Sequence, residues 1–247
     1  MMRIIDIHSH IIPNVDDGSP NLETSIFLIE EQIKQGVTDI ICTPHYRKGM
    51  FETSREDIVE NFNLLKKEVT NRNLNVSLYL GQETYLRRYG SLEKAIEINK
   101  IHTMNNTNYL LIEFSYTNEL DLSEIVYTTK LKGYIPIIAH IERYEYVGLE
   151  EAMEIVEAGG LIQVNASSVI GKHGGKIKKR VKKLLKNDLV SFIASDIHSN
   201  RKNYMQKAYQ FICKKYSEQL ANKLFFTNAM KMIGENNEEI CNNPCRR

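Results

Sequence analysis

The sequence predicts an α/β domain, a barrel of parallel strands surrounded by helices. Short apolar runs rich in β-branched residues alternate with longer amphipathic segments along the chain. Seven such strand–helix units in series imply a parallel sheet with right-handed crossovers, and this number of units usually closes into a barrel. No segment rich in Pro, Gly or Ser divides the chain, so residues 1–247 are expected to form a single domain.

The individual elements follow from these runs. Strands are expected at Arg3–His8, Asp39–Pro44, Val76–Gly81, Tyr109–Phe114, Ile135–Ala139, Leu161–Asn165 and Leu189–Ser195. The segment Asn21–Gly36 has apolar residues at helical spacing and a final glycine that is typical of a helix C-terminus. Further helices are expected at Arg55–Asn71, Glu124–Lys132, Leu149–Ala158, Gly175–Lys186 and Asn203–Tyr216. The polar stretch from about Gly234 to Arg247 is expected to fray.

Composition narrows the class of protein. The formal net charge is +1, so the overall charge of the protein does not favour binding to nucleic acid or to a membrane surface. No apolar run approaches the roughly 18 residues of a membrane span, and no signal peptide is evident. The four cysteines are irregularly spaced, which is typical of a reduced, cytoplasmic protein.

Histidines and carboxylates end six of the seven expected strands. Five of the seven histidines in the chain lie at such ends. The residues at strand ends are His8 and His10, His45, Glu83, Glu113, His140 with Glu142 and Arg143, and Asp196 with His198. In a barrel of parallel strands these ends meet on one face, which carries the active site. Imidazoles and carboxylates without thiolates suit catalytic Mn, Fe or Zn, and two or more ions can share a bridging carboxylate.

Several nearby polar residues leave alternatives open. Asp16 and Asp17 could equally be turn or N-cap residues. Asp6 could orient a metal ligand or be a buried structural group, and Glu142 could simply be solvated. His102 and His173 do not end a strand and are left out of the predicted site.

Taken in order, the segments "DIHSHIIPNVDDGS", "CTPHY", "GQE", "LIEF", "AHIERY" and "ASDIHS" resemble the PHP (polymerase and histidinol phosphatase) superfamily. The chain is most similar to the manganese-dependent protein-tyrosine phosphatases of Gram-positive capsule and exopolysaccharide operons. The similarity runs from Ile5 to about Arg201, and the ordered set is highly specific although H-x-H alone is weak. It implies a distorted TIM-like (β/α)7 barrel of the PHP type that hydrolyses phosphotyrosine on a cognate tyrosine kinase.

The resemblance also implies three metal ions, expected to be Mn²⁺, with Fe or Zn as alternatives. The ions would be held by His8, His10, Glu83 and Asp196, by Glu83, Glu113 and His140, and by Asp17, His45 and His198, respectively. Arg143 and Arg201 match the positions of the residues that bind the substrate phosphate in the family. Every ligand of the pattern is present, which argues against a non-catalytic metal-binding or scaffold protein.

The sequence also contains features of other phosphate chemistry. A small-molecule phosphomonoesterase such as histidinol phosphatase could use the same ligands, whereas the near-neutral charge disfavours a PHP nuclease. Residues Cys241 to Arg247 match the pattern C-x5-R, which is the motif of phosphatases that use a cysteine thiolate as nucleophile. That motif requires a loop between a strand and a helix, whereas here the sequence stops at the arginine, so the metal-dependent mechanism is favoured.

The run Lys172–Lys186 carries eight Lys or Arg in fifteen residues. It is expected to be a solvated helix face with Ile177, Val181, Leu184 and Leu185 turned inward. The alternative is a docking patch for an acidic, phosphorylated partner or for an anionic membrane. The resemblance implies a membrane-associated tyrosine kinase with a phosphorylated Tyr-rich tail as the partner, which is compatible with such a patch.

Overall fold

Parallel strands form the centre of the structure, a computed structural model that describes residues 3–87, 90–97 and 100–234. The strands are β1 (Ile4–Ser9), β2 (Val37–Cys42), β3 (His45–Tyr46), β4 (Ser77–Leu80), β5 (Glu83–Leu86), β6 (Tyr109–Phe114), β7 (Ile135–Ile138), β8 (Leu161–Asn165) and β9 (Phe192–Ala194). They form one sheet in the order β1-β2-β4 and another in the order β3-β5-β6-β7-β8-β9.

The two sheets together make the predicted distorted barrel. β3 and β5 follow β2 and β4 after short breaks. Hydrogen bonds between the two segments continue through the breaks, from Gly81 N to Cys42 O at 2.8 Å and from Glu83 N to Pro44 O at 3.1 Å. Pro44, which has no N–H to donate, lies in the break between β2 and β3. The ring closes between β9 and β1, where Ser9 bridges Ile197 and Asp196 N donates to His8 O at 2.9 Å.

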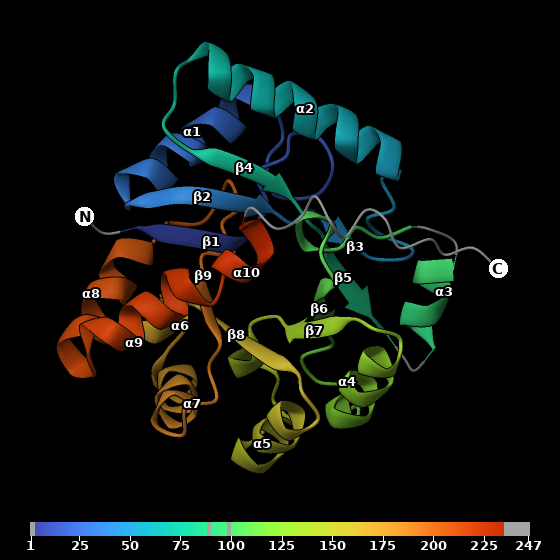
Figure 1. Cartoon of the computed structure of the whole chain (residues 1–247), viewed down its shortest axis with the longest axis vertical. Coiled ribbons are helices and arrows are strands. Elements are labelled where there is room, and N and C mark those ends of the chain that lie inside the picture. The colour runs from blue at the N-terminus through green and yellow to red at the C-terminus, as the bar shows by residue number, and fades with distance from the viewer. Residues whose placement is uncertain (1–2, 88–89, 98–99, 235–247) are drawn as a thin grey trace.

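Helices surround this ring of strands (Figure 1). They are α1 (Leu22–Lys34), α2 (Arg55–Asn71), α3 (Ser91–Glu97), α4 (Leu122–Leu131), α5 (Leu149–Glu157), α6 (Ala166–Val169), α7 (Gly175–Lys186), α8 (Met205–Lys215), α9 (Glu218–Asn222) and α10 (Met230–Ile233). Short 3-10 turns occupy Met104–Asn106 and Ile141–Arg143, and a π-helix spans Lys223–Thr227. Among the described residues, no helix is both long and apolar enough to cross a membrane.

Every predicted strand and helix is present within a few residues of its predicted bounds. α3, α6, α9, the π-helix and α10 were not predicted, because they are too short to show a clear period. The predicted third strand is interrupted and continues as β5, so Glu83 begins a strand of its own. The tail predicted to fray lies, apart from Gly234, outside the described residues, as do Cys241 and Cys245.

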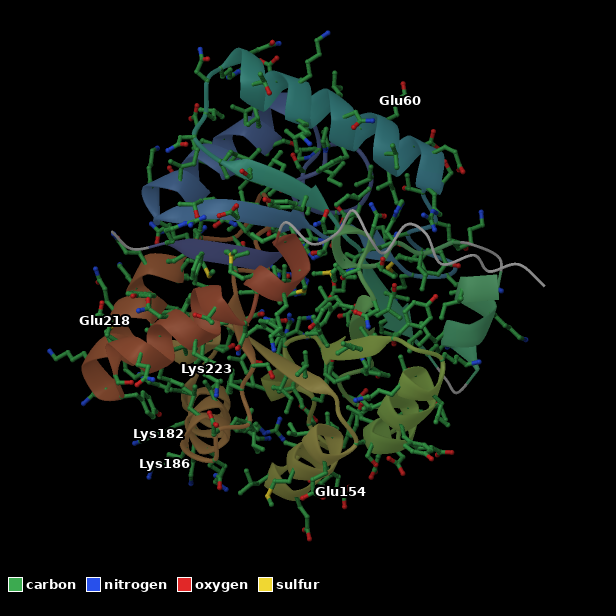
Figure 2. The ribbon with its side chains drawn as sticks, in the orientation of Figure 1. Glu60, Glu154, Lys182, Lys186, Glu218 and Lys223 are labelled. Atoms are coloured by element: carbon green, nitrogen blue, oxygen red, sulfur yellow. The ribbon has the colours of Figure 1, made fainter. Side chains whose placement is uncertain are left out.

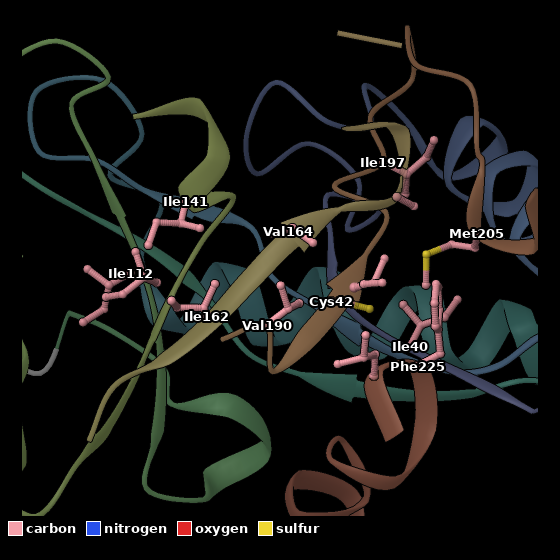
Figure 3. Packing of buried hydrophobic residues seen from close by; sticks show 14 of the residues in the cluster. Ile40, Cys42, Ile112, Ile141, Ile162, Val164, Val190, Ile197, Met205 and Phe225 are labelled. Atoms are coloured by element: carbon pink, nitrogen blue, oxygen red, sulfur yellow. The ribbon is translucent and has the colours of Figure 1, made fainter. Parts of the chain in front are cut away.

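Two apolar clusters stabilise the barrel from opposite sides of the strands. The larger one packs strand side chains such as Ile40, Ile112 and Val164 against the helices (Figure 3). The smaller one includes Ile7 and Leu111 from the strands together with Met232 of α10. The two clusters follow the alternation of strand side chains, since Leu111 of β6 belongs to one and its neighbour Ile112 to the other.

An irregularity in β1 turns the histidines toward the barrel interior. Three residue steps from Asp6 to Ser9 pair with only two steps from Ile40 to Cys42 on β2. Such an extra residue re-aims the side chains that follow it. Consequently Ile7 packs in the smaller cluster while the next residue, His8, also faces inward, toward Glu83.

Candidate metal centre

The residues predicted as metal ligands are brought together at the carboxyl ends of the strands. Donor atoms lie within 4.8 Å of one another in each of four sets. These are His10, Asp17, His45 and His198; His8, Glu83 and His140; His8, His10 and Asp196; and His45, Glu83 and Glu113. All nine predicted ligands are therefore near neighbours, although they come from segments up to 190 positions apart, from His8 to His198.

Glu83 lies at the middle of this cluster. Its Oε1 is 3.3 Å from His8 Nε2 and 3.0 Å from His140 Nε2. Its Oε2 is 2.8 Å from His45 Nδ1 and 3.4 Å from His10 Nε2. The side chain is completely buried, whereas that of Asp17, at the outer edge of the cluster, is 56% exposed.

The electrostatics of the cluster are those of tightly packed, opposed charges. Burial disfavours charged imidazoles, but the Glu83 carboxylate outweighs it and raises the pKa of His8 to about 9 and that of His45 to about 10. Burial opposes ionisation of Glu83 as well, yet the cationic His8 and His45 hold its pKa well below the usual value. Burial and the nearby Glu83 charge raise the pKa of Glu113.

Asp16, for which two roles were left open, orients the imidazole of His10 and holds the backbone of His45. His10 Nδ1 donates to Asp16 Oδ2 at 2.7 Å, so its Nε2 is directed into the cluster. The same oxygen accepts from the backbone N–H of His45 at 2.9 Å. Gly18 permits the loop to pack this closely, because a Cβ there would lie 2.1 Å from the His10 carbonyl oxygen. Asp16 is thus more than a turn residue, and its position next to Asp17 was the available signal.

A chain of amides, which the sequence analysis missed, links the two sides of the cluster. His8 Nδ1 donates to Gln163 Oε1 at 3.1 Å, and His140 N donates to the same oxygen at 2.9 Å. Gln163 Nε2 donates to Asn165 Oδ1, and Asn165 Nδ2 donates to Asp196 Oδ2, both at 2.8 Å. The signal was present in β8, where these two amides alternate with apolar residues and face inward.

Asp6 is buried and hydrogen-bonded, as both of its predicted alternatives require. It is fully buried, and its Oδ1 accepts from the backbone N–H of Ser195 at 2.9 Å. Its other carboxylate oxygen accepts from the Ser195 hydroxyl and from Gln32. Asp6 thereby positions the residue that precedes Asp196. His140 and Asp196 both adopt left-handed backbone conformations, with φ of 32° and 51°, which are uncommon outside glycine and cluster at functional sites.

Two arginines converge on the Asp196 side of the cluster. Arg201 Nη1 lies 2.7 Å from Asp196 Oδ2, and Arg143 Nη1 lies 3.5 Å from the same oxygen. The Arg143 guanidinium stacks over the Tyr116 ring at 4.5 Å, and the Tyr116 hydroxyl donates to Glu113 Oε1 at 3.1 Å. The side chain of Arg143 is 28% exposed and that of Arg201 is 41% exposed, so both arginines border the buried donors while remaining accessible to a ligand.

The remaining polar residues fall outside the cluster. Glu142, for which solvation was one alternative, is buried, and it accepts from Asn165 N at 3.0 Å. The solvated alternative is therefore wrong, since the short helical turn Ile141–Arg143 places Glu142 where its side chain bonds to β8. His102 is buried, and its backbone N–H donates to Gln82 Oε1. The thiol of Cys42 is buried in the apolar cluster between strands and helices, so it does not join the donors.

These donors fit metal ions. Glu113 Oε2 and His198 Nε2 are buried, and neither has a hydrogen-bond partner among the described residues. His8 Nε2 and His10 Nε2 face each other at 3.1 Å, an arrangement that a shared cation would stabilise. Nitrogen and carboxylate oxygen donors without sulfur are the set that Mn, Fe and Zn accept in catalytic sites.

The raised histidine pKa values predict that metal binding is coupled to proton release. His8 and His45 are protonated at pH 7 in the metal-free protein, and an imidazole must be neutral to bind a metal. Binding at pH 7 is therefore expected to release at least about two protons. Apparent affinity should rise from pH 7 to about 10, the higher of the two pKa values, with a smaller slope above the His8 pKa of about 9. Calorimetry in buffers of different ionisation enthalpy measures both quantities, and a binding enthalpy independent of the buffer would contradict the expectation.

Parallel α/β barrels carry their active sites where these polar strand ends meet, and the donor set suits catalytic metal ions. The fold and the site therefore define the class of α/β-barrel metalloenzymes. The family model described as "Capsular polysaccharide synthesis, CpsB/CapC" matches residues 4–234, and the chain belongs to this family.

Named relatives and solved structures agree with this assignment. The chain is 39% identical over 241 residues to tyrosine-protein phosphatase CpsB of Streptococcus agalactiae serotype V, covering 93% of this chain and 98% of the relative. It superposes with a TM-score of 0.85 and 29% identity on a structure from a study of YwqE of Bacillus subtilis and CpsB of Streptococcus pneumoniae, described as "unique metal-dependent tyrosine phosphatases". That match covers 93% of this chain and 94% of the other.

A histidinol phosphate phosphatase of Lactococcus lactis also matches, with a TM-score of 0.54 and 15% identity over 92% of this chain and 98% of the other. At that identity the likeness shows the fold alone. The predicted resemblance is confirmed by the family match. The relatives' names agree with the predicted enzyme class, metal-dependent phosphoric monoester hydrolases.

Proposed function

We propose that this chain is a cytoplasmic, metal-dependent protein-tyrosine phosphatase whose substrate is a phosphorylated tyrosine kinase controlling capsule synthesis. The observation that carries the proposal is the convergence of Arg143 and Arg201 on one edge of a buried cluster of imidazoles and carboxylates. The family assignment supports the substrate class, since relatives that align over nearly the whole chain are named tyrosine-protein phosphatases.

The nine clustered donors would hold three divalent ions, with Mn²⁺ as the proposed metal and Glu83 as the bridging ligand. When bound, such ions supply a water of lowered pKa and stabilise negative charge on phosphate. Asp16 and Gln163 would keep His10 and His8 in the orientation that directs their Nε2 atoms to the ions.

The two arginines would bind the substrate. In the structure both lie near one oxygen of the Asp196 carboxylate. A phosphate monoester dianion also offers anionic oxygen acceptors, and the planar guanidinium group of an arginine can donate to two of them at once. Stacking on Tyr116 restricts the Arg143 guanidinium before substrate arrives, which lowers the entropy lost on binding. Three divalent ions offset by Asp17, Glu83, Glu113 and Asp196 leave a net positive site that complements the dianion.

Phosphate release by metal-stripped protein, with Mn²⁺ added back, tests the proposal. The substrates compared are a phosphotyrosine peptide and histidinol phosphate, and His140→Ala is assayed beside the wild type. We expect metal-dependent release from the peptide that falls by at least about 100-fold in the variant. Preference for histidinol phosphate would keep the metal centre but contradict the protein substrate. Activity that ignores metal and survives His140→Ala would contradict the metal centre itself.

A further inference from the structure

A groove between α7 and α8 lies outside the metal centre. It has a volume of about 320 Å³, and Val169, Val181 and Leu185 contribute apolar side chains to its lining. Phe211 of α8 and Tyr216, just beyond α8, add aromatic rings. Its size and its apolar, aromatic lining are those of pockets that receive a ligand side chain.

Lysines surround the groove without carboxylates to neutralise them. Lys178, Lys182 and Lys186 repeat at every fourth position along α7, and Lys215 is contributed by α8. Neither helix contains Asp or Glu. Within the described part of the chain, the lysines that form ion pairs are Lys34 and Lys223, both elsewhere. Figure 2 shows Lys182 and Lys186 on the outer side of α7, so their charges are available to a partner.

Both helices of the groove are connected to segments that carry the candidate phosphate-binding arginines. Arg180 of α7 donates to the carbonyl oxygens of Tyr144 and Glu145 at 2.6 and 2.7 Å, which attaches this helix to the segment that follows Arg143. At the other wall, α8 begins four residues after Arg201. α7 is therefore hydrogen-bonded to the segment that follows Arg143, and α8 follows Arg201 directly in the chain.

We propose that this groove binds an acidic peptide segment of the phosphoprotein substrate, a segment separate from the phosphotyrosine that is hydrolysed. The inference rests on the proposed function and deepens it. Carboxylates or further phosphates in the segment pair with the lysines, and an aromatic or aliphatic side chain occupies the apolar lining. The long lysine stems cover apolar surface while their charged ends remain in water, so the groove can meet both requirements.

A membrane surface fits the same charges less well. Helices that lie on membranes insert exposed apolar side chains beside their basic residues. The apolar residues Val181, Leu184 and Leu185 of α7 are buried instead. Among the described residues, the large hydrophobic side chains that are exposed lie on neither α7 nor α8. The basic face is also hollowed rather than flat, which favours a peptide.

Charge reversal on one face of α7 tests the proposal. The groove variant combines Lys178→Glu, Lys182→Glu and Lys186→Glu. The matched control combines Lys176→Glu, Lys179→Glu and Lys183→Glu on the same helix, so that both lower the formal net charge equally. Neither set includes a residue of the metal centre, and all six lysines are exposed. Circular dichroism checks folding, and glutamine versions replace any variant that does not fold.

Two readouts are used with the full-length protein. Fluorescence anisotropy measures binding of an unphosphorylated acidic peptide, and steady-state kinetics compares its phosphotyrosine form with p-nitrophenyl phosphate. The groove variant should weaken peptide binding and raise the peptide KM by about tenfold, with kcat and all constants for p-nitrophenyl phosphate unchanged. The control variant should change peptide binding by less than about threefold, since surface charges off the groove contribute little.

Other outcomes would contradict the proposal that the groove binds the peptide. Equal losses in both variants would mean general electrostatic attraction, and an unchanged peptide affinity in the groove variant would mean that the peptide binds elsewhere. If the groove variant loses sedimentation with phosphatidylglycerol vesicles but keeps peptide binding, the face contacts membranes instead. Failure of the wild type to hydrolyse either phosphate ester contradicts the proposed function separately, because the anisotropy measurement requires no turnover.

Discussion

Replacing Glu83 with glutamine is expected to lower kcat/KM for p-nitrophenyl phosphate by more than about 100-fold. A loss of up to roughly that size is typical when a residue that only hydrogen-bonds a metal ligand is replaced, and a ligand itself should cost more. The two carboxylate oxygens of Glu83 lie within 3.4 Å of nitrogen atoms of four imidazoles. Glutamine has the same shape but offers one acceptor and no charge, so it cannot bridge two cations. Metal analysis should show fewer bound ions per chain, and Mn²⁺ should raise the melting temperature less than in the wild type.

Glu154→Gln is the matched control for this variant. Glu154 is an exposed carboxylate on α5, far from the strand ends, and Figure 2 shows it directed into solvent. Its replacement should leave kcat/KM within about twofold of wild type, as is usual for isolated surface substitutions. Full metal content and full activity in Glu83→Gln would show that the buried carboxylate is a structural partner of the histidines and not a metal ligand.

Replacing both Arg143 and Arg201 with lysine is expected to lower kcat/KM by about 10²–10³-fold while the metal content stays unchanged. Lysine keeps the positive charge but loses the planar fork that binds two oxygens of a phosphate at once. Inhibition by inorganic phosphate should weaken in parallel. The arginines and Glu83 would thus be distinguished, since only the Glu83 variant loses metal.

Arg72→Lys serves as the control for the arginine variant. Arg72, the residue after α2, forms surface ion pairs with Glu23 of α1 and Glu68 of α2. The activity of this variant should match wild type, since exposed ion pairs contribute little. Loss of metal from the double lysine variant would contradict a purely substrate-binding role. It would indicate that the arginines hold Asp196, from which they lie 3.5 and 2.7 Å, in place for the ions.

The family and its fold could be predicted from the sequence because the relevant signals are local. Seven apolar runs with polar ends show where parallel strands begin and finish, and strand polarity then requires that their carboxyl ends share a face. His8 and His10 belong together because residues two apart in a strand point the same way. The arginines entered through the resemblance, since nothing in their spacing relates Arg143 to Arg201.

The orienting residues could not be predicted because their roles depend on long-range packing. Gln163 reaches His8 across 155 positions, and Asn165 reaches Asp196 across 31. Asp16 lies in a loop whose path is determined by the close contact of Gly18 with His10. A polar residue within an apolar strand was the only local sign of the amides, and it does not reveal which partner such a residue meets.

The sequence by itself determined which groups are present and at which strand ends they lie, because side-chain chemistry and strand period are local properties. Tertiary structure decided how those groups meet. The extra residue in β1 turns His8 inward directly after the inward-facing Ile7, against simple alternation. Closure of the ring brings Asp196 beside His8, and the packing of α7 beside α8 turns a basic run into a groove. Each of these depends on contacts between distant segments, which pair only once the whole barrel has formed.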